Sequence, residues 1–440
     1  MLSAVARIFR TPDLRRKVLF TLLIVAIFRL GSFVPAPFVN FSNVQTCLAA
    51  QQTGTNGLYQ LINVFSGGAL LQLSIFALGI MPYITSSIIV QLLRVVIPRF
   101  EALYKEGAEG QGRLTQYTRY LTIALGVLQS TTLITVARSG SLFGSSGVPE
   151  CSDLLTNTDW WAIVLMIVTL TAGTGLIMWL GELITERGVG NGMSLLIFTS
   201  IAATFPGSIA AIWAARSPEV AILVVAVGVL IVAAVVFVEQ SQRRIPVEYA
   251  KRMVGRRTYG GNNTYIPIKV NMAGVVPVIF ASSLLYLPAL IAQFNTPAQG
   301  APPAWVQWIT EYLTTGDHPL YMAVYFLLIV GFTYFYVAIT FNPEEVADNM
   351  KKYGGFIPGI RAGRPTAEYL DYVLTRVTLP GSIYLGLVAL IPLIALVLVG
   401  ANANFPFGGA SILIIVGVGL ETVKQIDSQL QQRHYEGLLR

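Results

Sequence analysis

The chain has 440 residues, of which 54% are hydrophobic and only 12% are charged, and its formal net charge is +7. A composition this apolar, arranged in long uncharged runs, excludes a soluble globular domain and predicts a polytopic membrane protein. The positive charge is first a signal of membrane topology, and nucleic-acid binding is the weaker interpretation.

Ten apolar stretches are long enough to cross a bilayer, since about 20 apolar residues span a hydrocarbon core roughly 30 Å thick. An even number of spans places both termini on one side of the membrane, and the expected fold is all-α. In chain order the stretches cover residues 18–36, 75–97, 117–137, 160–180, 189–213, 219–238, 272–293, 320–341, 376–399 and 405–424.

Lys and Arg are distributed unevenly among the loops that join these spans. Of the 29 in the chain, 26 lie on the side shared by the termini, and only Arg138 and Arg216 lie in the alternate loops. Because cytoplasmic loops carry the excess of Lys and Arg, both termini are predicted to be cytoplasmic. The first apolar stretch is too long for a signal-peptide core and lacks a small-residue cleavage site, so we expect a retained helix.

Arg29 is the only charged residue well within a predicted span. Solute transporters usually place several charged residues inside the membrane as substrate or proton sites, because burying a charge there is costly. Their absence lowers the transporter alternative without excluding it. For Arg29 itself, a snorkelling or structurally paired side chain is the simpler expectation, and a functional role is the alternative.

Two cysteines, Cys47 and Cys151, fall in loops predicted to lie outside the cytoplasm. A disulfide is chemically allowed there, but it requires the two Cα atoms to come within about 7 Å, which a sequence does not reveal. Both possibilities stay open, and two unpaired loop cysteines are the simpler expectation.

The second span is preceded by an interrupted apolar segment. Leu58 to Phe65 is apolar but has only about half the length of a span, and Ser66, Gly67 and Gly68 separate it from the run that follows. Glycine permits positive φ angles and costs a helix interior about 1 kcal/mol relative to alanine. The segment is either a weakly held re-entrant helix surrounded by protein or water, or a helix on the lipid surface.

Two large basic loops are predicted on the cytoplasmic side, at about residues 239–271 and 341–375. The first contains QRRIPVEYAKRMVGRR, and the second contains glycine and proline turns around GFIPGIRAGRP. Positive charge, aromatic side chains and defined turns indicate docking surfaces for a large anionic partner, such as a ribosome or a motor protein. The alternative is that these loops are basic only because cytoplasmic loops generally are.

No pattern in the sequence indicates a catalytic, metal or cofactor site. The only two histidines, His318 and His434, lie outside the spans, so a His-based triad would have to join loops on opposite membrane faces. The glycines around Gly107 lack the lysine of a phosphate-binding loop. We therefore expect no enzyme, and any ATP must be hydrolysed by a partner.

Several long motifs follow one another along essentially the whole chain. They are FSGGAL, SIFALGIMPYITSSIIVQLL, QYTRYLT, GELITERGVGNGMSLLIF, QRRIPVEYAKR followed by GRR, PIKVNMAGVVPVIFASS and GFIPGIRAGRPTAEYLDYVLTRVTLPG. Together they resemble the SecY family, the channel subunits of the bacterial protein-translocation complex. The resemblance implies ten helices in two inverted halves, residues 1–213 and 214–440, that close like a clamshell around a pore.

The resemblance also implies how the pore is closed. A short plug helix at about residues 61–74 would stop it, and the plug residues would be Phe65, Ser66, Gly67, Gly68, Ala69 and Leu70. A narrow apolar collar dewets and resists ion leak, and it can pack around a passing chain of any sequence. The collar, called the pore ring below, would consist of Ile80, Ile84, Met193, Ile197, Ile279 and Ile414. Met193 departs from the branched aliphatic residue usual at its position and predicts a softer seal.

A lateral gate is implied where spans two and three face spans seven and eight. Hydrogen bonds between helices in membranes contribute only about 0.6–2 kcal/mol each, so a polar seam can open. Pro82 removes a main-chain donor and is expected to kink span two. Ordinary helix packing is the alternative for these small polar side chains. The seam residues would be Thr85, Ser86, Ser87, Gln91, Asn271, Ser282 and Ser283.

Cytoplasmic docking residues are implied at Arg256, Arg257, Arg361 and Tyr435, although Ala362 replaces a common proline and predicts a less rigid loop tip. The implied partners are SecE, SecG, the ATPase SecA, the ribosome, signal-bearing preproteins and nascent membrane proteins. The implied location is the bacterial cytoplasmic membrane. The resemblance therefore predicts a protein-conducting channel, with a secondary solute transporter as the alternative.

Overall fold

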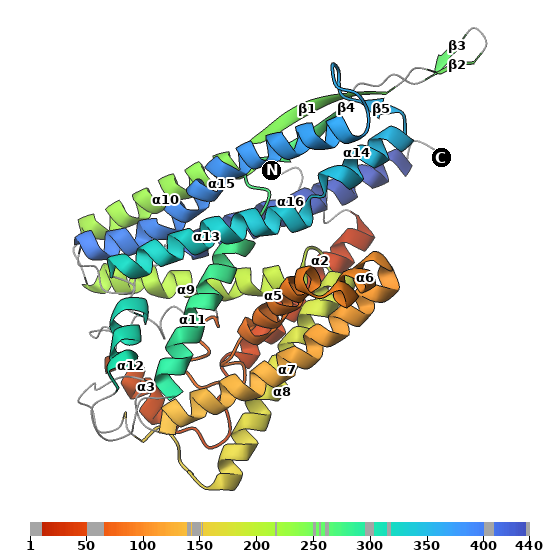
Figure 1. Ribbon diagram of the computed structural model, residues 1–440. Helices are drawn as coiled ribbons and strands as arrows, with labels where there is room; N and C mark the ends of the chain where they lie inside the picture. Colours follow the sequence, from red (N-terminus) through yellow and green to blue (C-terminus); the bar gives the residue numbers. More distant parts are fainter. Residues whose placement is uncertain are drawn as a thin grey trace.

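The computed structural model describes residues 11–50, 66–138, 142, 151, 153–215, 218–249, 252–254, 257–259, 264–294, 303–314, 318–399 and 409–436. These residues form a bundle of long helices with a small sheet at one end (Figure 1). The predicted all-α fold is therefore correct for the bundle but omitted the sheet.

Each predicted span overlaps one long helix. Proline occupies the first turn of α2 and α13, where its missing N–H costs nothing and its fixed φ suits a helix start. The first half contains α2 (Pro12–Gly31), α5 (Met81–Val96), α7 (Ala108–Arg138), α8 (Trp160–Arg187) and α9 (Gly192–Ala215). The second half contains α10 (Pro218–Gln240), α11 (Val276–Phe294), α13 (Pro319–Thr340), α15 (Arg364–Val399) and α16 (Gly409–Glu436).

Four of the described helical segments are long and apolar enough to cross a membrane by themselves. They are Ala108–Arg138, Trp160–Arg187, Pro319–Lys352 and Arg364–Ile391. A further candidate is the pair of α5 and α6 (Pro98–Lys105), which is bent by 100°. These helices support the prediction of a membrane protein.

The second span differs from the sequence prediction in two ways. Pro82 lies in the first turn of α5 and helps to start it, so the predicted kink at Pro82 is wrong. The bend comes instead at Ile97, whose extended backbone precedes Pro98 at the start of α6. The residue before a proline is biased away from the helical conformation, which explains why α5 ends here.

The segment from Ser66 to Ile80 consists of turns and one isolated bridge, so the described part of the expected plug helix is not helical. Gly67, Gly68 and Leu73 have φ angles of +68°, +91° and +47°. A right-handed helix requires negative φ throughout, and these residues interrupt it. The remainder of the expected plug, up to Phe65, lies outside the described residues.

Both basic loops contribute strands to one small sheet. β1 (Gln242–Tyr249) pairs antiparallel with β4 (Thr264–Lys269), and β5 (Gly355–Phe356) pairs with the other edge of β1. β2 (Arg252–Val254) and β3 (Arg257–Tyr259) form a hairpin that projects beyond this sheet (Figure 1). We call β1, β4 and β5 the two-loop sheet, because it joins loops that are about 100 residues apart in sequence.

Shorter helices flank the bundle. α3 (Phe41–Ala50), α12 (Ala304–Ile309) and the π-helix η4 (Thr310–Thr314) lie at one end, and α14 (Pro343–Lys352) lies beside the two-loop sheet at the other (Figure 1). The two halves of the chain touch where α9 contacts α16 and where α5 contacts α11. These contacts bring residues from both halves to the middle of the bundle.

Candidate functional site: an apolar ring with its plug

All six predicted pore-ring residues lie in one apolar cluster at the meeting of the two halves. Ile80, Met193, Ile197 and Ile414 are buried there, and Ile84 and Ile279 pack against them partly buried. They come from the start of α5 and from α9, α11 and α16, elements separated widely in sequence. The resulting collar has no polar ring member.

Met193 packs tightly in the ring because α8 approaches it through a glycine. A Cβ atom on Gly181 would lie 2.5 Å from Met193 Sδ, far closer than two such atoms can approach. Asn191 Oδ1 accepts a hydrogen bond from the Met193 N–H at 3.1 Å and so helps to start α9. The flexible side chain of Met193 is thus held against the main chain of the neighbouring helix.

The turns from Ser66 to Ser74, called the plug turns below, pack directly on the pore ring. Ala69 is fully buried in the same apolar cluster as the ring residues. Ser66 Oγ accepts a hydrogen bond from the Leu70 N–H at 3.0 Å, and Ser74 Oγ donates one to the Ala69 carbonyl at 3.3 Å. These local hydrogen bonds satisfy main-chain groups that no helix satisfies, which permits irregular backbone inside a bundle.

The other face of the plug turns packs on a second cluster. Leu70, Leu71 and Leu73 are buried together with Val44 of α3 and Leu154. We call residues 34–40, α3, Cys151 and residues 153–156 the cap. The plug turns therefore lie between the ring and the cap.

Main-chain hydrogen bonds join the cap to the plug turns and join the segments of the cap to each other. The Ala36 N–H donates to the Leu73 carbonyl, and the Ile75 N–H donates to the Val34 carbonyl, both at 2.9 Å. On the other side, the Asn40 N–H donates to the Leu154 carbonyl at 2.9 Å. The segment after α2 thus connects the plug turns to residues 153–156.

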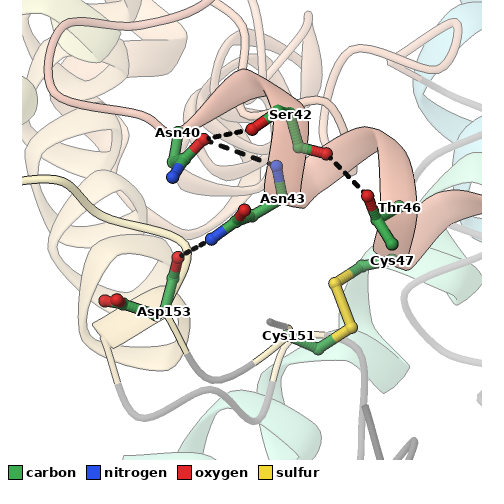
Figure 2. Close-up of a disulfide and its surroundings, with 7 residues drawn as sticks. All are labelled: Asn40, Ser42, Asn43, Thr46, Cys47, Cys151 and Asp153. Carbon is green, nitrogen blue, oxygen red and sulfur yellow. Dashed lines mark hydrogen bonds between the residues drawn. A yellow bond between two sulfur atoms is a disulfide. The ribbon is translucent and has the colours of Figure 1, made fainter. Parts of the chain in front are cut away.

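A disulfide joins Cys47 and Cys151 in the cap, so the simpler expectation of two unpaired cysteines is wrong (Figure 2). The two Cα atoms are 5.6 Å apart although the residues are 104 positions apart in sequence. Asn43 Nδ2 also donates to the Asp153 carbonyl at 2.8 Å (Figure 2). The disulfide and this hydrogen bond both link α3 to the start of the segment formed by Cys151 and residues 153–156, of which Leu154 and Thr156 pair with residues 38–40.

Arg29 reaches from the last turn of α2 to the plug. Its Nη1 donates a hydrogen bond to the Gly67 carbonyl at 2.6 Å, and its guanidinium carbon lies 4.8 Å from the centre of the Phe33 ring. Arg29 is therefore a paired side chain, and its partner belongs to the expected plug. Sequence reasoning missed its partner, because a main-chain carbonyl carries no sequence signal.

The expected lateral-gate residues are mostly bonded within their own elements. Thr85 and Ser86 donate to main-chain carbonyls one turn earlier in α5, Gln91 donates to Ser87, and Ser282 donates to the Ile279 carbonyl. Although α5 contacts α11, no hydrogen bond between described residues joins these side chains across that contact.

Two expected gate residues have other surroundings. Asn271 Nδ2 donates to Glu239 Oε1 at the end of α10 and to the Gly274 carbonyl, so its hydrogen bonds lie away from α5. Ser283 Oγ is buried and lacks a hydrogen-bond partner among the described residues. The structure therefore groups these residues less closely than the pore ring.

The described docking residues lie outside the strands of the two-loop sheet. Arg361 is exposed in the turn between β5 and α15, and its carbonyl accepts a hydrogen bond from Thr366 Oγ1 at 2.8 Å. Arg257 begins β3 of the projecting hairpin, and Tyr435 belongs to the last turn of α16. Arg256 lies outside the described residues.

Comparisons with known proteins show which family the chain resembles. A family model described as SecY matches residues 74–423. The protein named protein translocase subunit SecY in Streptomyces galbus is 63% identical over 447 aligned residues, and the one in Micrococcus luteus is 60% identical over 442; each match covers 100% of both chains.

A solved structure described as that of a protein-conducting channel is also similar. Its TM-score is 0.61 at 16% identity, and the match covers 93% of this chain and 91% of that one. At so low an identity this likeness concerns the fold alone.

Proposed function

The chain belongs to the SecY family of protein translocase subunits, and we propose that its apolar ring is the seal of a protein-conducting channel. The channel would pass unfolded, signal-bearing proteins across the bacterial cytoplasmic membrane and release transmembrane segments sideways into lipid. The observation that carries the proposal is the convergence of the six ring residues, from both halves of the chain, on one cluster that also contains Ala69.

An apolar ring suits a channel whose cargo has no fixed sequence. Side chains such as Ile80 and Ile414 offer no hydrogen bond that would hold one substrate group in preference to another. A narrow collar of such side chains also excludes water, and an ion that crosses it loses its hydration. The secondary-transporter alternative gains nothing from the comparisons, because the relatives are named as translocase subunits.

Ten spans in two inverted halves, residues 1–213 and 214–440, are part of the proposal. The overlap of each predicted span with a long helix supports it. The distribution of Lys and Arg supports placing both termini and the two-loop sheet in the cytoplasm, and the cap outside. A disulfide is chemically compatible with that outer location.

Sideways release requires a seam that opens without breaking many bonds, and we assign it to the contact of α5 with α11. The polar side chains of α5 already satisfy their hydrogen bonds within that helix. Separating the two helices would therefore leave few polar groups unpaired, which keeps the cost of opening low. The seam residues named from the sequence remain part of this proposal.

The two-loop sheet is the proposed docking surface for SecA or a ribosome, with Arg256, Arg257, Arg361 and Tyr435 as contact residues. The pairing of β1 with β5 supports this assignment, because it holds the two basic loops side by side. SecE and SecG are proposed as further subunits of the complex.

The test is ATP-driven protection of a signal-bearing preprotein from protease, in vesicles that contain this chain with SecE, SecG and SecA. We expect protection that requires ATP and falls at least tenfold in Arg361→Glu. Arg138→Glu is the matched control, since Arg138 is also exposed and lies at the end of α7, outside both basic loops. Equal loss in both variants would refute the docking role of Arg361, and no protection by the unaltered chain would refute the channel.

A further inference from the structure

We propose that Arg29 is a latch that holds the plug on the ring by binding the main-chain carbonyl of Gly67. This inference rests on the proposed channel function. The Arg29–Gly67 hydrogen bond measures 2.6 Å and joins residues 38 positions apart in sequence. Arg29 is thus a positioning residue that acts through the plug.

The hydrogen bond to the Gly67 carbonyl is the main polar contact of Arg29 among the described residues. None of the ion pairs among the described residues includes Arg29. Its guanidinium donates to the Gly67 carbonyl and lies over the ring of Phe33. A cation at membrane depth is unfavourable without an acceptor, and a hydrogen bond from a charged donor is stronger than one between neutral groups. Removing the plug would leave Arg29 without this acceptor, so Arg29 favours the closed pore.

The backbone of Gly67 is shaped for this contact. Its φ of +68° is in the region that favours glycine, and a Cβ there would lie 3.1 Å from Arg29 Nη1 and 3.2 Å from Ser200 Cα. Gly68 also has positive φ, yet a Cβ there would meet nothing within 4 Å. A side chain at position 67 would therefore crowd the Arg29 guanidinium, whereas one at position 68 would not.

A main-chain acceptor also suggests what replaces the plug when it leaves. A translocating polypeptide offers the same carbonyl group at every residue, whatever its sequence. The guanidinium could then exchange the Gly67 carbonyl for one of the passing chain. The acceptor class is thus the peptide carbonyl, first of the plug and then of the substrate.

The test is the resting ion leak of vesicles that contain the complete complex, measured without preprotein or ATP. We expect Arg29→Met to raise the leak about tenfold, as the loss of one charge-assisted hydrogen bond implies. Arg29→Lys, which keeps the charge, should give an intermediate leak. Arg138→Met is the matched control, since Arg138 is exposed at the end of α7, and its leak should equal that of the unaltered chain.

A double-variant cycle with Gly67→Ala separates the latch from a general loss of packing. If both residues act through one contact, Arg29→Met adds little leak once Gly67→Ala is present. Fully additive leaks, or a leak of Arg29→Met within twofold of the unaltered chain, would overturn the latch. If the complex with Arg29→Met does not assemble, the leaks of Arg29→Lys and Gly67→Ala test the latch instead, and leaks within twofold of the unaltered chain would overturn it. ATP-driven protection in the same vesicles tests the channel separately, so failure of the latch is distinct from failure of the proposed function.

Discussion

The cap and the two-loop sheet lie at opposite ends of the bundle, and each joins segments far apart in sequence (Figure 1). The cap uses a covalent bond between Cys47 and Cys151, together with a buried cluster that includes three leucines of the plug turns. The sheet uses only hydrogen-bonded strands over an apolar cluster. The disulfide thus lies in the cap, the end of the bundle that packs on the plug turns.

The difference follows from what each end is proposed to do. A plug that must return to one position benefits from a support whose unfolded alternatives are restricted by a cross-link. A docking surface benefits from exposed, basic turns such as the one that carries Arg361, which a partner can reach. Comparing the local stability of the two ends tests this division.

The largest expected effect comes from removing the disulfide. Cys47→Ala together with Cys151→Ala should destabilise the cap by about 2–5 kcal/mol, because the bond closes a long loop of chain. Amide hydrogen exchange should accelerate in α3 and stay unchanged in β1. Reductant should reproduce this in the unaltered chain and have no effect on the double variant. Equal acceleration of amide exchange in α3 and β1 would contradict the expected difference between the cap and the two-loop sheet.

The matching change in the two-loop sheet is Ile268→Ala. Ile268 is fully buried in a cluster with Ile245, Val247 and Leu370, so the cavity should destabilise the sheet by about 2–4 kcal/mol. Exchange should accelerate in β1 and remain slow in α3. Binding of the proposed partner SecA should weaken while the resting leak stays the same. A raised leak would show that the sheet also supports the seal.

Asn43→Ala makes a smaller change within the cap. It removes the 2.8 Å hydrogen bond to the Asp153 carbonyl, which contributes about 1 kcal/mol. Exchange in α3 should accelerate about fivefold, as that free energy implies. Ser42→Ala is the control, because the Ser42 hydroxyl donates to Asn40 Oδ1, two residues away, and does not link the two segments. If both variants behave alike, the cross-segment bond is unimportant.

The smallest expected effect is that of Tyr265→Leu in the sheet. The guanidinium carbon of Arg244 lies 4.8 Å from the centre of the Tyr265 ring, and both side chains are exposed. A cation–π contact at such a site contributes about 0.5 kcal/mol. Exchange in β1 should therefore accelerate only about twofold. A tenfold effect would mean that the sheet depends on surface contacts more than on its core.

Several features could be predicted from the sequence because they depend on local composition or on long motifs. The spans follow from apolar runs, since the bilayer sets the length that each helix needs. The six ring residues came from motif resemblance, and they do share one cluster. Periodicity alone would not have distinguished them, because a buried isoleucine in the ring looks like any other apolar helix residue.

The sequence by itself determined where the long helices lie, and its motifs named six residues that share one apolar cluster. Only the tertiary structure decided that Cys47 meets Cys151, that β1 pairs with β5, and that Arg29 binds Gly67. The physical reason is the same in each case. Helix formation depends on neighbouring residues, whereas these contacts join groups far apart in the chain, and two of them use main-chain atoms that every residue carries.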